Sequence, residues 1–240
     1  FSINQSDGVT AVSQDLKDQT YTNFQITSNI EVIPNFVDLT RFRKAKKEHF
    51  KKAIAPHGEK ILIHTSNFRK VKRTQDVVLI FQKVHEQIPS KLLLVGDGPE
   101  RQNLEILCRD LNLSEYVRFL GKQDPVEELL AVSDLFLMPS ETESFGLAAL
   151  EAMACQVPVI ASNAGGIPEI MIQGVTGFMS DVGDVDDMSK RAIFILIDDE
   201  RHNQFKIQAL EHAKKYDLEK VLPKYEAFYE KVLQDSTVVQ

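Results

Sequence analysis

The sequence predicts an α/β fold in which helices cover both faces of a parallel sheet. From Lys60 onward, short runs of aliphatic and β-branched residues alternate with longer amphipathic patterns, and the loops between them are short. This alternation is typical of strand–helix–strand units, whose strands pair in parallel. The central short runs, ILIHT, KLLLVG, LFLMP and VPVIAS, are apolar on both sides, as strands buried on both faces are. A Rossmann-like sheet is therefore expected.

Individual elements follow from the same pattern. Strands are predicted at residues 61–65, 91–95, 117–120, 135–138, 157–161 and 177–179. Helices are predicted between them at residues 74–87, 100–111, 126–131, 147–154 and 167–171, and further helices at 185–197, 201–215 and 218–233. In an open parallel sheet, ligands bind at the carboxyl ends of the strands, so a site is expected in the loops that follow them.

The first 38 residues precede this alternation. A short apolar strand at 9–12 leads into a helix for which Ser13 is a suitable N-cap. Residues 30–38 indicate a strand that runs into a linker marked by Pro34, which predicts a domain boundary near residue 35. Because Phe1 lies in the middle of a pattern rather than at a natural start, we expect a further segment upstream.

The composition argues against several classes of function. A net charge of −7 disfavours nucleic acid as a partner, because binding a phosphate backbone needs a basic surface. The sequence has no apolar run long enough to span a bilayer, so no membrane partner is expected. Cys108 and Cys155 lack CxxC spacing, and we expect buried thiols in a reducing, cytoplasmic setting rather than a disulfide or a zinc site.

The strongest local motif lies between the predicted strand 135–138 and the helix 147–154. Backbone amides near Phe145, Gly146 and Leu147 would form the helix start, where unpaired N–H groups favour a phosphate, and a side chain at Gly146 would obstruct its approach. Glu143 and Glu151 flank this turn and could accept hydrogen bonds from the hydroxyl groups of a sugar and of a ribose. Alternatively, the helix dipole simply favours two acids there.

A basic run, Arg69-Lys-Val-Lys-Arg73, follows the predicted strand 61–65. Charge runs usually form solvated loops, but cations at this edge of the sheet can neutralise a diphosphate held at the neighbouring helix start. Fixed cations would also stabilise the charge that a leaving nucleoside diphosphate gains. Lys72 and Arg69 are the preferred candidates, whereas Lys70 and Arg73 are expected to point to solvent.

The remaining motifs are weaker. The turn that starts at Gly96 is not the GxGxxG fingerprint, and Gly165 and Gly166 could either form a simple turn or allow the close approach of a sugar. His64 falls within a strand and is interpreted as a core residue rather than as a base. The sequence shows no Ser-His-Asp arrangement and no metal-ligand spacing.

In this order and spacing, the motifs resemble the family 4 retaining glycosyltransferases of the GT-B fold. The most diagnostic feature is the pair Glu143 and Glu151, which flank seven residues. Asn67 departs from the family by replacing a common arginine, with Arg69 two residues further on. Gln156 replaces a common glycine, which predicts a local backbone cost. The matching strings are IPNFVD, LVGDGPE, VRFLG, SDLFLMPSETESFGLAALEAMACQVPVIAS, GGIPE and GVTGF.

The resemblance implies a reaction as well as a fold. The strings HTSNFRKVKRTQDVV and FLGKQDPVEELLAVSDL resemble family members that transfer N-acetylglucosamine from UDP-GlcNAc to L-malate in bacillithiol biosynthesis, with retention at the anomeric carbon. Attack assisted by the leaving phosphate implies no protein nucleophile, no metal and no cofactor. The resemblance implies a donor site in which Lys72 and Arg69 bind the diphosphate, while Ser144, Phe145, Gly146 and Leu147 hold the sugar and the β-phosphate. Glu143 would bind a sugar hydroxyl, Glu151 would bind the ribose, and Gln123 would lie near the uracil. Gly96 is also implied as a donor-binding residue.

The resemblance also implies three regions. Residues 1–35 would be a remnant of the N-terminal acceptor domain with its linker, residues 36–216 the donor-binding domain, and residues 217–240 a helix that crosses back toward the N-terminal domain. L-Malate would be bound mainly outside this chain, so the chain alone is expected to bind the donor without transferring sugar. A second copy of the chain, forming a homo-oligomer, is a further candidate partner.

Three other functions remain open. Another family 4 enzyme could use a lipid or glycan acceptor, although the acidic charge disfavours work at a membrane. A GT-B nucleotide-sugar epimerase would also bind UDP-GlcNAc and would release free sugar without an acceptor. A binding module without catalysis would leave the two glutamates as ordinary helix-start residues.

Overall fold

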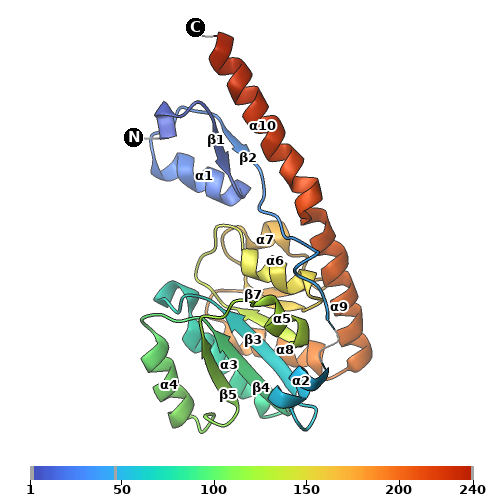
Figure 1. The fold of residues 1–240 in the computed structure, drawn as a ribbon. Helices are drawn as coiled ribbons and strands as arrows, with labels where there is room; N and C mark the ends of the chain where they lie inside the picture. Colours follow the sequence, from blue (N-terminus) through green and yellow to red (C-terminus); the bar gives the residue numbers. More distant parts are fainter. Residues whose placement is uncertain (1–2, 46–47, 239–240) are drawn as a thin grey trace.

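The structure, a computed structural model, describes residues 3–45 and 48–238 (Figure 1). Within these ranges, six parallel strands form the main sheet in the order β5-β4-β3-β6-β7-β8. This confirms the predicted fold class, and each predicted strand is found close to its expected bounds. The strands are β3 (Lys60–Thr65), β4 (Ser90–Val95), β5 (Val117–Gly121), β6 (Leu135–Met138), β7 (Val159–Ser162) and β8 (Gly177–Ser180).

Two hydrophobic clusters hold helices against opposite faces of this sheet. Alternate residues of a strand point to opposite sides, so Ile61 and Ile63 of β3 join one cluster while Leu62 joins the other. The central strands are mainly apolar on both faces for this reason. Residues of α2 (Glu48–Ile54), α5 (Glu127–Val132), α6 (Leu147–Ala154) and α7 (Ile167–Ile170) belong to the first cluster. Residues of α3 (Thr74–His85), α4 (Arg101–Asp110) and α8 (Val185–Leu196) belong to the second. Helix α9 (Asp199–Ala213) contributes residues to both clusters.

One helix was not predicted, and several predicted helices have other bounds than expected; α10 (Leu218–Val238), for example, ends at Val238 rather than at residue 233. The short helix α2 was not predicted, because Ile54 is its one buried residue and no apolar period forms. Helix α9 begins two residues before its predicted start. The Asp198 side chain caps it there by accepting a hydrogen bond from the Arg201 amide at 3.0 Å. In the described part of the chain, no helix combines the length and the apolar character needed to cross a membrane.

The N-terminal segment forms a small unit beside α10 (Leu218–Val238). Strands β1 (Val9–Ala11) and β2 (Ile30–Val32) pair in parallel and are connected by α1 (Gln14–Asn23). Ser13 caps α1 as predicted, since its Oγ accepts a hydrogen bond from Leu16 N at 3.1 Å. Figure 1 shows α10 running from the main sheet to a position alongside β1 and β2. There the Tyr225 hydroxyl donates to the Ile33 carbonyl at 3.2 Å.

The two chain connections between this unit and the main sheet lie side by side. Val37 N donates to the Tyr216 carbonyl at 2.9 Å, and Leu218 N donates to the Val37 carbonyl at 3.0 Å. The predicted domain bounds at residues 35 and 216 fall at these connections, and they remain predictions.

Candidate functional site

A pocket of about 240 Å³ lies at the carboxyl ends of β3 and β6. The end of β3, the β6–α6 loop, the first turn of α6 and the linker before α2 all contribute to it. It brings together six of the residues that the sequence predicted for the donor site, namely Lys72, Glu143, Ser144, Phe145, Gly146 and Leu147. The other lining residues are Asn35, His64, Thr65, Ser66, Met138, Ser140 and Ala148.

An ion pair between Lys72 and Glu143 crosses the pocket. Lys72 Nζ lies 2.6 Å from Glu143 Oε1, and the two side chains are 24% and 14% exposed. The Ser140 hydroxyl donates to the same carboxylate oxygen at 2.8 Å. Because water reaches this pair poorly, its attraction is stronger than that of a pair on an open surface.

The start of α6 supplies backbone N–H groups to the pocket. Gly146 is the N-cap with φ +92°, and no side chain in the described ranges caps this end. The first intrahelical bond runs from Ala149 N to the Gly146 carbonyl at 2.9 Å, so the amides that precede Ala149 lie outside the helical ladder. Such groups carry the positive end of the helix dipole and favour an anion.

The packing of α7 against the start of α6 gives a further reason for a glycine at position 146. A Cβ at this position would lie 2.4 Å from Ile167 Cδ1 and 3.1 Å from Ile170 Cδ1, which belong to the core. A side chain would therefore clash with α7 as well as strain the positive φ. The predicted obstruction of a phosphate by a side chain at Gly146 stays a prediction.

The glycines after β7 pack against the β6–α6 loop. A Cβ on Gly165 would lie 2.0 Å from the Glu143 carbonyl oxygen, and one on Gly166 would lie 2.5 Å from the Ser144 carbonyl oxygen. Gly166 N donates to the Glu143 carbonyl at 2.8 Å. These glycines therefore let two backbone segments meet, which fixes the loop that carries Glu143.

Gly96 has a similar packing role beside β3. Its φ is +121°, and a Cβ there would lie 1.8 Å from the Ser66 carbonyl oxygen. The turn after β4 thus packs directly against the loop after β3. Gly96 is not among the residues that line the pocket, and its predicted contact with the donor stays a prediction.

His64 is buried beneath the pocket, as predicted for a core residue. Its Nδ1 lies 2.8 Å from the Leu137 carbonyl oxygen, which can only accept, so Nδ1 carries the proton and Nε2 accepts from the Ser66 hydroxyl at 2.7 Å. Burial, together with the positive charge of Lys72, lowers the pKa of His64 to about 4, so the ring is neutral. The sequence did not indicate that this ring fixes Ser66 at the pocket wall.

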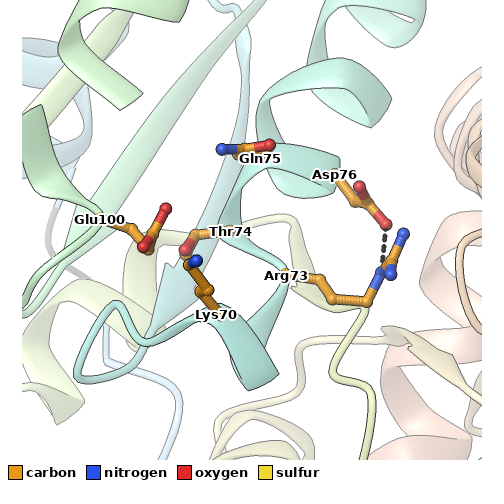
Figure 2. Close-up of a pocket in the computed structure, with 6 residues that line it drawn as sticks. All are labelled: Lys70, Arg73, Thr74, Gln75, Asp76 and Glu100. Atoms are coloured by element: carbon orange, nitrogen blue, oxygen red, sulfur yellow. Dashed lines mark hydrogen bonds and ion pairs between the residues drawn. The ribbon is translucent and has the colours of Figure 1, made fainter. Parts of the chain in front are cut away.

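The basic run after β3 divides between two places. Lys72 faces Glu143, whereas Lys70 and Arg73 line a separate hollow with Thr74, Gln75, Asp76 and Glu100 (Figure 2). Arg73 was expected to point to solvent. Instead, its Nε lies 2.7 Å from an Asp76 carboxylate oxygen. Arg69 is exposed and does not line the donor-site pocket, so its role on a diphosphate stays a prediction.

Glu151 extends the same face of α6. It lies four residues after Leu147 and three after Ala148, spacings that place side chains next to one another on a helix. Burial raises the pKa of Glu151 to about 7; the Arg41 guanidinium lowers it, and Glu127 raises it. Arg41 also binds both carboxylate oxygens of Glu127, at 2.9 and 3.0 Å. No motif in the sequence indicated Arg41.

Gln123 lies at the same edge of the sheet, in the loop between β5 and α5. Its side chain is exposed, and Nε2 donates to the Leu120 carbonyl at 2.5 Å. This contact orients the amide, while its predicted proximity to uracil stays a prediction.

The part of the chain that the structure describes has neither a metal-binding cluster nor a disulfide. Among the described residues, no group of three or more His, Cys, Asp or Glu side chains could hold a metal ion. Both cysteines are free and buried, as expected, and burial raises the pKa of the Cys155 thiol to about 12.

Comparison with known sequences gives consistent matches. The family model "Glycosyl transferases group 1" matches residues 45–212. N-acetyl-alpha-D-glucosaminyl L-malate synthase of Bacillus anthracis is 46% identical over 237 residues, which are 98% of this chain and 62% of that protein. D-inositol 3-phosphate glycosyltransferase of Corynebacterium jeikeium is 30% identical over 205 residues, which are 79% of this chain and 49% of that protein. The chain thus spans less than two thirds of the length of these relatives.

Solved structures share the fold. HepE of Anabaena, in complex with UDP and glucose, superposes with a TM-score of 0.87 at 23% identity, covering 95% of this chain and 64% of that one. A variant of TarM from S. aureus, in complex with Fondaparinux, alpha-GlcNAc-glycerol and UDP, gives a TM-score of 0.82 at 24% identity, covering 95% of this chain and 45% of that one.

Proposed function

This chain belongs to the family of group 1 glycosyl transferases, and on that premise we propose that it is the donor-binding part of a retaining enzyme that transfers N-acetylglucosamine from UDP-GlcNAc to L-malate. The observation that carries the proposal is the pairing of Lys72 with Glu143 beside the uncapped start of α6. The 46% identity to an N-acetyl-alpha-D-glucosaminyl L-malate synthase supports the choice of donor and acceptor.

The diphosphate of the donor binds between Lys72 and the amides of Gly146 and Leu147. The helix start and the ammonium group act on the same charge, and both are partly shielded from water. The recorded contacts of the Glu143 carboxylate are both made by Oε1, so Oε2 is the oxygen that accepts from a sugar hydroxyl. Arg69 supplies a second cation once the diphosphate is bound.

The nucleoside end of the donor lies further along α6. Ionised Glu151 accepts hydrogen bonds from both ribose hydroxyls, and Gln123 lies near the uracil. Arg41 supports this arrangement, because its positive charge favours the ionised form of Glu151.

Sugar transfer needs stabilisation of the leaving group. The bond between the anomeric carbon and the UDP oxygen breaks while the malate hydroxyl oxygen attacks from the same face, and the hydroxyl proton passes to the departing phosphate. Lys72 and the α6 amides stabilise the negative charge that develops on UDP, as fixed dipoles and cations do without reorganising. No protein nucleophile and no metal enter this scheme.

The acceptor is bound mainly by residues outside this chain. Residues 1–35 contribute the edge of an acceptor domain, residues 36–216 bind the donor, and residues 217–240 connect the two. The chain alone therefore binds UDP-GlcNAc without transferring its sugar. A cytoplasmic location suits the small, charged donor and acceptor and the two free thiols.

A product assay with the full-length protein tests this function. UDP-GlcNAc is offered alone, with L-malate, and with lipid or glycan acceptors, and UDP and sugar products are followed. The proposal predicts UDP release that depends on L-malate. Release only with a lipid or glycan identifies another transferase of the family, and free sugar product without an acceptor identifies an epimerase.

A further inference from the structure

The first turn of α1 is held by residues of the donor-binding region, far away in sequence. Glu169 Oε2 accepts a hydrogen bond from Gln14 N at 2.8 Å, and Oε1 accepts one from Asp15 N at 2.9 Å. These amides lie at the start of α1, where they have no partner within the helix. A carboxylate there is also favoured by the helix dipole. Glu169 thus docks the N-terminal unit onto α7.

Ser13 makes a second contact from the same turn. Its hydroxyl is buried, with the residue 1% exposed, and donates to the Ser144 carbonyl at 2.6 Å. The same oxygen accepts from Leu16 N at 3.1 Å. One side chain therefore both caps α1 and holds the loop that lines the donor pocket.

The two contacts converge on adjacent peptide units. Ser13 holds the Ser144 carbonyl, while Gly166 N, three residues before Glu169, holds the Glu143 carbonyl at 2.8 Å. The far end of α7 is fixed as well, since the Tyr216 hydroxyl donates to the Glu169 carbonyl at 2.9 Å. The loop is thus fixed from two sides just before the amides that begin α6.

We propose that Ser13 and Glu169 are positioning residues, through which docking of α1 sets the 143–147 loop for the sugar and β-phosphate of the donor. This rests on the proposed function. Hydrogen bonds to a diphosphate depend steeply on placement, so a small shift of this loop weakens them. By reciprocity, a bound donor tightens the docking of α1 in turn.

Binding measurements on the chain can separate positioning from simple helix capping. Ser13→Gly removes the contact to Ser144 while keeping a tolerated N-cap residue. Glu169→Gln removes the charge that holds the two amides. Asp198→Asn is a matched control, because Asp198 caps α9 through Arg201 N, on a helix that does not line the donor pocket. The ligands are UDP-GlcNAc and UMP, which lacks the sugar and the β-phosphate.

Both test variants are expected to bind UDP-GlcNAc about fivefold or more weakly, because each loses a charged or buried hydrogen bond. Their affinity for UMP should not change. Asp198→Asn is expected to change neither. Hydrogen exchange of the Gln14 and Asp15 amides should slow when UDP-GlcNAc binds the wild type. Equal losses for both ligands indicate general damage to the fold and overturn the proposal, as does unchanged UDP-GlcNAc affinity in Ser13→Gly. A wild type that binds neither ligand instead contradicts the proposed function itself.

Discussion

The ammonium group of Lys72 lies 2.6 Å from a carboxylate oxygen of Glu143, so the cation assigned to the donor diphosphate already has an anionic partner. A diphosphate must therefore compete with Glu143 for Lys72. The same pair keeps both side chains in place across the pocket, because each is largely shielded from water. Donor binding and the state of this pair are therefore coupled.

The first prediction follows from that competition. In Glu143→Gln, Lys72 loses its charged partner and is free to bind phosphate, so UDP affinity should rise about threefold or more. The affinity for UDP-GlcNAc should rise less, because the sugar hydroxyl loses a charged acceptor. Isothermal titration with both ligands measures the difference. Equal weakening of both would show that the pair does not oppose phosphate binding.

Donor affinity should depend on pH through Glu151. Burial raises the pKa of this carboxyl to about 7, and its ionised form accepts from the two ribose hydroxyls more strongly than its protonated form does. UDP-GlcNAc should therefore bind more tightly as the pH rises from 6 to 8, and Glu151→Gln should flatten the profile. Titration of both proteins across this range checks it; a wild-type profile as flat as that of the variant would contradict the ribose assignment.

The same residue affects stability with the opposite trend. The folded pKa of about 7 exceeds the unfolded value, so protonation favours the folded state. That contribution is fully present below the unfolded pKa and is lost as the pH rises through 7. Glu151→Gln should therefore stabilise the chain by about 1–3 kcal/mol at pH 8 and by less at pH 5. Urea unfolding at the two pH values measures this difference. A larger gain in the free energy of unfolding at pH 5 than at pH 8 would contradict the prediction.

Gln156 provides a prediction away from the pocket. The resemblance predicted a backbone cost there, and its φ of +61° confirms the left-handed conformation that favours glycine. Gln156→Gly should raise the free energy of unfolding by about 0.5–1 kcal/mol and leave UDP affinity unchanged. Chemical denaturation and titration check the two parts. A loss of stability would mean that the glutamine side chain makes a contact worth more than the strain.

Gly166 tests the packing of the donor loop. A Cβ there would lie 2.5 Å from the Ser144 carbonyl oxygen, a backbone atom that cannot move alone. Gly166→Ala should displace the loop and lower the affinity for UDP-GlcNAc by up to about 100-fold. Gly58→Ala is the control, since nothing lies within 4 Å of its Cβ and its cost is confined to a φ of +81°. Similar affinities for the two variants would argue against a loop fixed by glycine packing.

The sheet was predictable because its strands are buried on both faces and therefore carry a strong local signal. The meeting of Lys72 and Glu143 was also predictable, since the loops after β3 and β6 share one edge of the sheet. Contacts such as Ser13 with Ser144 join residues 131 positions apart and leave no local pattern. For the same reason the sequence could not place Arg41 near Glu151, nor could it show that a side chain at position 146 would clash with Ile167.

The central claim is that Lys72 binds the donor diphosphate at the start of α6. Lys70 is the matched control, because it has the same charge two residues away and lines a different hollow (Figure 2). UDP titration should show affinity at least about tenfold weaker in Lys72→Ala, as loss of a charge-assisted contact predicts, and little change in Lys70→Ala. Equal UDP affinity in the wild type and Lys72→Ala would contradict the claim.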